Sequence, residues 1–190
     1  MKKIAPSAFE GTPWAAKKIK KRKDKLLIVN HILLDGTKAR GKVKVPKGVT
    51  AISENAFSNN KKVSSITISS TVKTVGEYAF MRTNIKKISF PKKVKSIGEG
   101  ALYGCGKLKE VTILNSKAKV VWVPKGYFGG TIFDGPMSGI AGNKIVIKGY
   151  KNSTAQKLTN HMQDAINAYK KYYMGDYMRY KIVVFTPVRR

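Results

Sequence analysis

The 190-residue chain has almost none of the side chains on which metal sites and nucleophilic enzymes depend: it has one cysteine, Cys105, and two histidines, His31 and His161. A single cysteine forms no internal disulfide and leaves no Cys/His set for a structural zinc ion. Neither histidine lies near Cys105 in the sequence, so the sequence does not indicate a nucleophile–base pair. We therefore expect no catalytic residues, no bound metal and no cofactor.

Acidic residues are also scarce. Asp and Glu total 10 against 38 for Lys and Arg, which gives a net charge of +28 and an isoelectric point near 10.2. Such an excess favours polyanionic partners. The simpler interpretation is that lysines fill the solvated positions of a regular fold, and composition leaves both open.

Long apolar runs are absent too. The longest, Leu26–Leu34, is broken by Asn30 and His31 and is far shorter than the roughly 20 residues that a membrane-spanning helix needs. It predicts two short buried strands that meet at a turn. The basic start of the chain is followed by prolines and a glutamate rather than by the apolar core of a signal peptide.

What the chain does have is a repeat of 22 or 23 residues: V-T-A-I-S-E-N-A-F starts at Val49, V-K-T-V-G-E-Y-A-F at Val72 and V-K-S-I-G-E-G-A-L at Val94. Apolar residues occupy equivalent positions in the three copies, and we call each set of equivalent residues a column. The columns are Ile52/Val75/Ile97, Ala56/Ala79/Ala101, Phe57/Phe80/Leu102, Val63/Ile85/Leu108, Ile66/Ile88/Val111 and Ile68/Phe90/Ile113. A unit this small cannot bury its own apolar face, so the copies must stack and share one core. The period therefore predicts a repeat solenoid.

The repeat also suggests boundaries. Ile4 and Ala8-Phe9 resemble an incomplete first copy, so we expect an interrupted first repeat over 1–45, regular repeats over 46–114 and an expanded repeat over 115–150. In the expanded repeat, Val120 and Val123 stand 26 residues after Val94 and Ile97, which predicts an insertion near 115–118, and the strand at 145–147 stands 34 residues after Val111–Ile113. A chain that opens inside a repeat is expected to be a fragment of a longer one.

Seven of the nine residues from Lys17 to Lys25 are basic. Such a run is typical of a nucleic-acid or heparin patch or a nuclear targeting signal. The interpretation that we prefer is an exposed turn joining two strands.

The last quarter of the chain changes period. Ser153-x-x-Gln156 matches a capping box, and apolar residues then recur at helical spacing, which predicts a helix from about Thr154 to Tyr172. Ile182–Phe185 predicts a final strand. Because the end of a solenoid must turn one face to water, we interpret 151–190 as a C-terminal helix–strand cap on a solenoid domain of 1–150.

The string I-G-E-G-A-L-Y-G-C-G-K-L-K-E-V-T-I, from Ile97 to Ile113, resembles the BspA-like (bacterial surface-antigen type) leucine-rich repeat, and the pattern returns over 75–91 and 52–69. The family cysteine is present at Cys105, and Asn60 and Thr83 stand in the corresponding turns. The resemblance implies a leucine-rich-repeat-like right-handed stack of short strands and turns. It also implies an exported bacterial surface protein that binds host or matrix proteins and carries no enzymatic residues in its repeats.

Outward strand positions are free to serve a partner. Lys44, Thr67, Ser89, Thr112 and Val146 are predicted to point away from the core, flanked by Lys42, Lys87, Glu110, Lys144 and Lys148. On the concave side of a solenoid these positions form a mildly basic, hydroxyl-bearing surface. Our candidate partner-binding residues are Lys42, Lys44, Thr67, Lys87, Ser89, Thr112, Lys144 and Lys148.

Two functions follow as hypotheses. The first is a non-catalytic protein-interaction module, part of a secreted or cell-surface adhesin-like protein with an export signal upstream, acting as a monomer on a host or matrix protein. The alternative is a basic module that binds a polyanion such as glycosaminoglycan, teichoic acid or nucleic acid, for which steep weakening with added salt is the signature.

Overall fold

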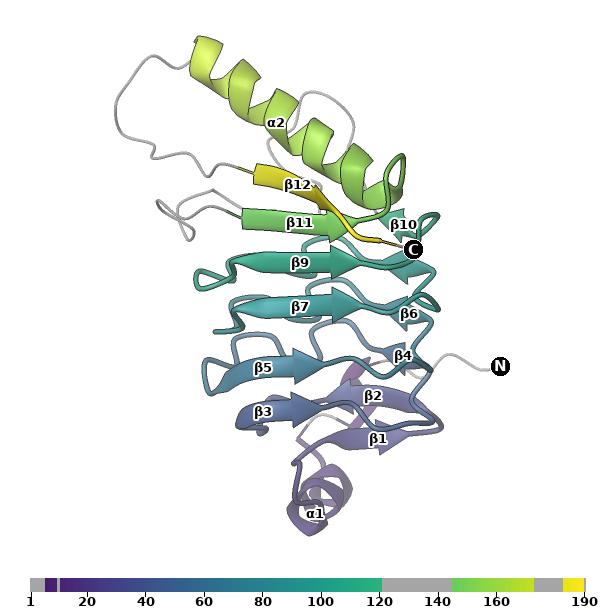
Figure 1. Cartoon of the computed structure of the whole chain (residues 1–190). Helices are drawn as coiled ribbons and strands as arrows, with labels where there is room; N and C mark the ends of the chain where they lie inside the picture. The colour runs from purple at the N-terminus through teal and green to yellow at the C-terminus, as the bar shows by residue number, and fades with distance from the viewer. Residues whose placement is uncertain (1–5, 10, 121–144, 173–182, 190) are drawn as a thin grey trace.

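The computed structural model describes residues 6–9, 11–120, 145–172 and 183–189. Each regular repeat contributes one two-residue strand and one longer strand. Equivalent strands lie side by side in a stack, with a helix at each end (Figure 1). We call the repeat units coil 2 (49–71), coil 3 (72–93) and coil 4 (94–116).

One side of the stack is a six-stranded sheet in the order β1-β2-β4-β6-β8-β10. Ile52 lies opposite Val75, and Val75 lies opposite Ile97, in parallel register. This column is therefore confirmed, as is the turn inside Leu26–Leu34, where β1 and β2 pair antiparallel. The strands are β1 (Leu27–Val29), β2 (Ile32–Asp35), β4 (Ala51–Ile52), β6 (Thr74–Val75), β8 (Ser96–Ile97) and β10 (Lys119–Val120).

The other side carries longer strands in two groups. β3 (Gly41–Lys44) pairs with β5 (Val63–Thr67), and a separate parallel sheet has the order β12-β11-β9-β7. β5 and β7 are neighbours in the stack (Figure 1), yet no ladder joins them. The second group consists of β7 (Lys87–Phe90), β9 (Glu110–Ile113), β11 (Ile145–Gly149) and β12 (Val183–Pro187).

The shared core lies between the two sides. All the predicted columns are buried and belong to one continuous hydrophobic cluster. The rings of Phe57 and Phe80 stack with centroids 5.7 Å apart, and Leu102 continues their column, fully buried. Burying each large side chain contributes roughly 1.5–3 kcal/mol, so stability rests on contacts between coils.

Three buried polar residues hold the turns that precede the long strands. Asn60 Nδ2 donates to the carbonyls of Gly36 and Ala39, both at 2.9 Å. Thr83 Oγ1 donates to the carbonyl of Phe80 at 2.9 Å, and Cys105 Sγ lies 3.1 Å from that same oxygen. These equivalent turn positions thus satisfy backbone carbonyls inside the core, where an unpaired carbonyl would be costly.

The register of β10 corrects one prediction. Val120 lies opposite Ile97, not in step with Val94, so this strand follows β8 with the ordinary offset of 23 residues and no net insertion precedes it. Val123, the other residue of that alignment, lies outside the described residues. Val120 and Val123 have the same spacing as Val94 and Ile97, so the sequence allowed Val120 to be aligned with Val94. Only the strand pairing shows that Val120 is equivalent to Ile97.

The basic segment does not form the predicted turn. Pro13–Lys21 is a helix, α1, preceded by the 3₁₀ helix η1 (Pro6–Phe9) rather than by a strand. Thr12 caps α1 by accepting a hydrogen bond from the Ala15 N–H, and Pro13 occupies the first turn, where its missing N–H does no harm. Basic residues fill the last turn, where they complement the helix dipole.

At the other end, α2 (Thr154–Tyr172) matches the predicted helix and packs on β11 and β12. The predicted capping box is not formed: Gln156 Oε1 accepts from the N–H of Asn152, the Ser153 N–H donates to the Tyr150 carbonyl, and the buried Ser153 Oγ has no partner in the described structure. β12 covers Val183–Pro187 and pairs in parallel with β11; Ile182, the predicted start of this strand, lies outside the described residues.

Candidate partner-binding face

The outward positions of β3, β5, β7, β9 and β11 form one polar surface, which we call the sheet face. Alternation along each strand creates it: in β7, Ile88 and Phe90 are buried while Lys87 and Ser89 are exposed. Register then aligns Lys44 with Thr67 and Ser89 with Thr112. The structure therefore places these four predicted residues in two in-register pairs, with Lys42 and Lys87 beside them.

The end of this face differs from the prediction. Lys148, not Val146, lies opposite Thr112, and Val146 lies opposite Glu110. β11 thus follows β9 with an offset of 36 residues rather than 34. A shift of two keeps the same side chains outward, so the burial pattern alone could not detect it. Lys144 lies outside the described residues.

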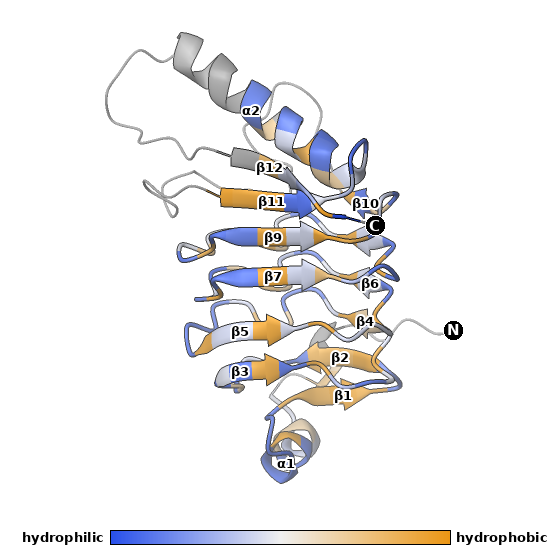
Figure 2. Ribbon diagram, viewed as in Figure 1, coloured by the Kyte–Doolittle hydropathy of each residue, from blue (hydrophilic) through white to orange (hydrophobic). Residues whose placement is uncertain are grey.

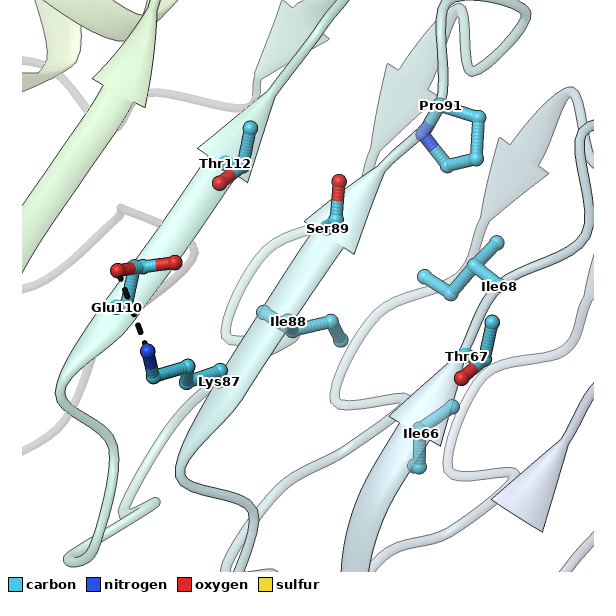
Figure 3. Close-up of a pocket in the computed structure, with 9 residues that line it drawn as sticks. All are labelled: Ile66, Thr67, Ile68, Lys87, Ile88, Ser89, Pro91, Glu110 and Thr112. Atoms are coloured by element: carbon cyan, nitrogen blue, oxygen red, sulfur yellow. Dashed lines mark ion pairs between the residues drawn. The ribbon is translucent and has the colours of Figure 1, made fainter. Parts of the chain in front are cut away.

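A hollow of about 290 Å³ opens on the sheet face beside the missing ladder between β5 and β7 (Figure 3). Thr67, Ser89 and Thr112 present hydroxyl groups along it, and Ile66 and Ile88, whose side chains are buried in the core, also border it. Its other lining residues are Ile68, Lys87, Pro91 and Glu110. The hollow therefore offers apolar contact with hydrogen-bonding groups at its edge.

Sequence reasoning missed the hollow but contained a signal for it. Two residues separate Asn60 from Val63 in coil 2, and two separate Cys105 from Leu108 in coil 4. Only Asn84 separates Thr83 from Ile85 in coil 3. The turn that enters β7 is thus one residue shorter, and Asn84 Nδ2 donates to the Lys61 carbonyl at 2.7 Å, linking the two turns through a side chain.

Glu110 organises the charge on this face. Its Oε2 lies 2.9 Å from Lys148 Nζ and 3.6 Å from Lys87 Nζ. The hydrogen bond from Lys148, opposed by some desolvation, and the nearby charges hold the pKa of Glu110 below its usual range. Both lysines are thereby partly neutralised, whereas Lys42 and Lys44 are exposed and have no acidic partner among the described residues. The basic part of the sheet face is its β3 end.

Within the described ranges, no three His, Cys, Asp or Glu side chains gather as a metal site would require. Cys105 is fully buried against Phe80 and Thr83. No helix in the described part of the chain is long and apolar enough to cross a membrane.

Two solved structures are similar to parts of this chain. A leucine-rich repeat protein from Bacteroides ovatus is similar over 62% of this chain and 35% of its own, with 22% identity and a TM-score of 0.33. The pneumococcal vaccine antigen PcpA is similar over 87% of this chain and 47% of its own, with 15% identity and a TM-score of 0.43. The chain thus spans less than half of either structure, and no curated protein matches it.

The repeat pattern itself decides the family. The BspA type leucine-rich repeat region matches residues 2–121 in six copies, which is well over half of the chain. The chain belongs to the BspA-type leucine-rich repeat family.

Proposed function

We propose that this chain is a non-catalytic protein-interaction module of a secreted or cell-surface protein, and that its sheet face binds a host or matrix protein. In this proposal the repeats over 1–150 form a solenoid, and residues 151–190 cap it through α2 and β12. The surface location is proposed because the family resemblance implies export.

The observation that carries the proposal is the separation of core and face along the same strands. In β5, β7 and β9 the buried residues hold the stack together, and the residues between them are outward and polar. Changes at the outward positions therefore leave the core intact, which is how repeat proteins present variable binding surfaces.

The chemistry of the face indicates the kind of partner. Its hydroxyl groups and apolar hollow suit an extended protein segment that places one or two side chains between β5 and β7. The unpaired Lys42 and Lys44 favour acidic residues in the part of that segment that lies over β3. A volume of about 290 Å³ lies at the lower limit of pockets that enclose a small molecule, which favours a protein over a small substrate.

The test is a binding screen against purified extracellular-matrix proteins with a matched pair of variants. T67W fills the hollow, whereas T74W places the same side chain on the exposed Thr74 of β6, on the other side of the stack. We expect T67W to weaken binding by about tenfold or more, as for loss of a central contact, and T74W to bind like the unmodified protein. Equal binding by both variants would exclude the sheet face.

Polyanion binding is the second candidate, favoured by the 38 basic residues against 10 acidic ones. Affinity for a polyanion falls steeply with salt because counterions are released. A protein complex formed through the hollow depends less on ionic strength, so a salt titration of the same complexes separates the two functions.

A further inference from the structure

A second surface lies at the N-terminal end of the stack, where α1 packs on β1 (Figure 1). Ala15 is buried and Ile19 half-buried, and both join Leu27 and Leu34 in a small separate hydrophobic cluster. Figure 2 shows the contrast between the hydrophobic β1 and β2 and the α1 ribbon, which carries many hydrophilic residues. The apolar side of this helix is thus already used in folding.

The opposite side of α1 presents a compact basic surface. Trp14, Lys17, Lys18 and Lys21 are all exposed, and their spacing of i, i+3, i+4 and i+7 places them on one helical face. We call these four residues the α1 face. Lys20 and Lys23 are exposed beside it, so the positive charge is concentrated within about two helical turns.

No acidic residue in the described structure neutralises this face. Asp24 is the sole acid between Gly11 and Leu26, and it is engaged elsewhere. Its carboxylate accepts two hydrogen bonds from Arg22, at 2.8 and 2.6 Å, and one from the Leu26 N–H. The ammonium group of Lys25 donates to the carbonyl of Lys20. Lys17, Lys18 and Lys21 are left for an external anion.

We propose that the α1 face binds a densely sulfated polysaccharide. Lysine supplies point charges that suit sulfate groups along a chain. A lipid bilayer is disfavoured because surface-bound helices insert their apolar side, whereas Ala15 and Ile19 are packed against the stack.

Nucleic acid is disfavoured by the same contacts. Recognition of single strands uses free aromatic rings for stacking, but the Trp14 ring already lies 4.8 Å from the Phe9 ring and 5.5 Å from Lys18 Nζ. Arginine supplies the bidentate contacts to phosphates and bases, and the guanidinium of Arg22 is held by Asp24. Trp14 is 43% exposed, but its ring is engaged by Phe9 and Lys18, so what α1 offers is mainly charge. This inference concerns a different surface from the sheet face and does not depend on what that face binds.

The experiment measures the affinity of a heparin hexasaccharide by calorimetry at about 0.15 M salt. The variant K17Q/K18Q/K21Q removes three charges from the α1 face. The control K92Q/K93Q/K95Q removes three from exposed positions in the turn before β8. Glutamine is nearly as good a helix former as lysine, and circular dichroism together with the melting temperature verifies that α1 and the fold persist.

We expect the α1 variant to weaken binding by about tenfold or more and the control by less than about threefold, because charges near a bound polyanion dominate its affinity. Equal losses in the two variants would show a diffuse charge effect and overturn the proposal. Absence of heparin binding by the unmodified protein would also overturn it, as would tighter binding to a single-stranded oligonucleotide, to poly(glycerol phosphate) or to vesicles containing phosphatidylglycerol. A failure on the sheet face in the matrix-protein screen would leave this result unchanged.

Discussion

The two sides of the stack are built from the same coils but differ in continuity. On one side β4, β6 and β8 are only two residues long, yet they belong to an unbroken six-stranded sheet. On the other side β5 and β7 are longer, at five and four residues, yet no ladder joins them. Strand length therefore does not determine continuity.

The turns that enter the long strands differ in length between the coils. Coil 3 has one residue fewer than coil 2, and the missing residue lies in the turn between Thr83 and Ile85, immediately before β7. β6 precedes that turn, and β8 follows it by half a coil. The strands of the six-stranded sheet are therefore separated from the shorter turn by enough residues to keep their register. The shorter turn of coil 3 thus coincides with a polar hollow on one surface while the core columns remain aligned, although β9, which follows a full-length turn, still pairs with β7.

The largest effect is expected on the continuous side, with Gly98→Ala. An added Cβ at Gly98 would lie 2.5 Å from the backbone N of Glu77 in the preceding coil, and a backbone atom cannot move aside as a flexible side chain can. The clash should outweigh the entropic gain that Gly→Ala gives at a compatible site. We expect a loss of about 1–3 kcal/mol in the free energy of unfolding, measured by urea denaturation.

Ser89→Ala is the control on the side with the missing ladder. Ser89 is exposed on β7, so its loss should change stability by less than about 0.5 kcal/mol. If Gly98→Ala were as mild as Ser89→Ala, the close approach of coils on the continuous side would not be a constraint, and the contrast between the two sides would lose its physical basis.

A smaller effect should follow from restoring the missing residue, by inserting one glycine between Asn84 and Ile85. Lys86 and Phe90 accept backbone hydrogen bonds from the β9 side, so by alternation the N–H groups of Lys87 and Ser89 face β5. With a full-length turn these groups should pair with β5. Each new bond contributes about 1 kcal/mol, which we expect as roughly fivefold slower amide hydrogen exchange at Lys87 and Ser89.

The matched control inserts a glycine between Lys107 and Leu108, where the turn already has its full length. That variant should leave exchange at Ser89 unchanged. Unaltered exchange in the first variant, in a protein that remains folded, would refute turn length as the cause of the break. Restored pairing would also be expected to close the hollow and reduce any partner binding there.

The sequence predicts the columns well because burial repeats with the period: Ile52, Val75 and Ile97 have equivalent environments, so one copy informs the next. It fails where information is not periodic. Val120 was misaligned because two valines offered the same spacing, and Lys148 because a shift of two preserves which side chains point outward. The helix α1, Pro13–Lys21, was missed because its basic residues conceal a short apolar side made of Ala15 and Ile19.

The smallest effect concerns the ion pairs that tie β9 to its neighbours on the laddered side. Glu110 bonds Lys148 on β11 and Lys87 on β7, whereas coil 2 has Ser65 opposite Lys42, with no acid to continue the pattern toward β5. Because Lys148 and then Lys87 lower the pKa of Glu110 in the folded state, its stabilising effect is present at neutral pH and is lost as the pH falls through that lowered pKa. These side chains are partly exposed, so Glu110→Gln should lower the free energy of unfolding by no more than about 1 kcal/mol at neutral pH, and the difference from the unmodified protein should shrink in acid.

Urea denaturation from neutral to acid pH measures this difference, with Glu54→Gln as the control because Glu54 is exposed and has no ion-pair partner among the described residues. A Glu110→Gln deficit that stayed constant down to acid pH would mean that the side chain acts through packing, and that charge does not distinguish the laddered strands from β5.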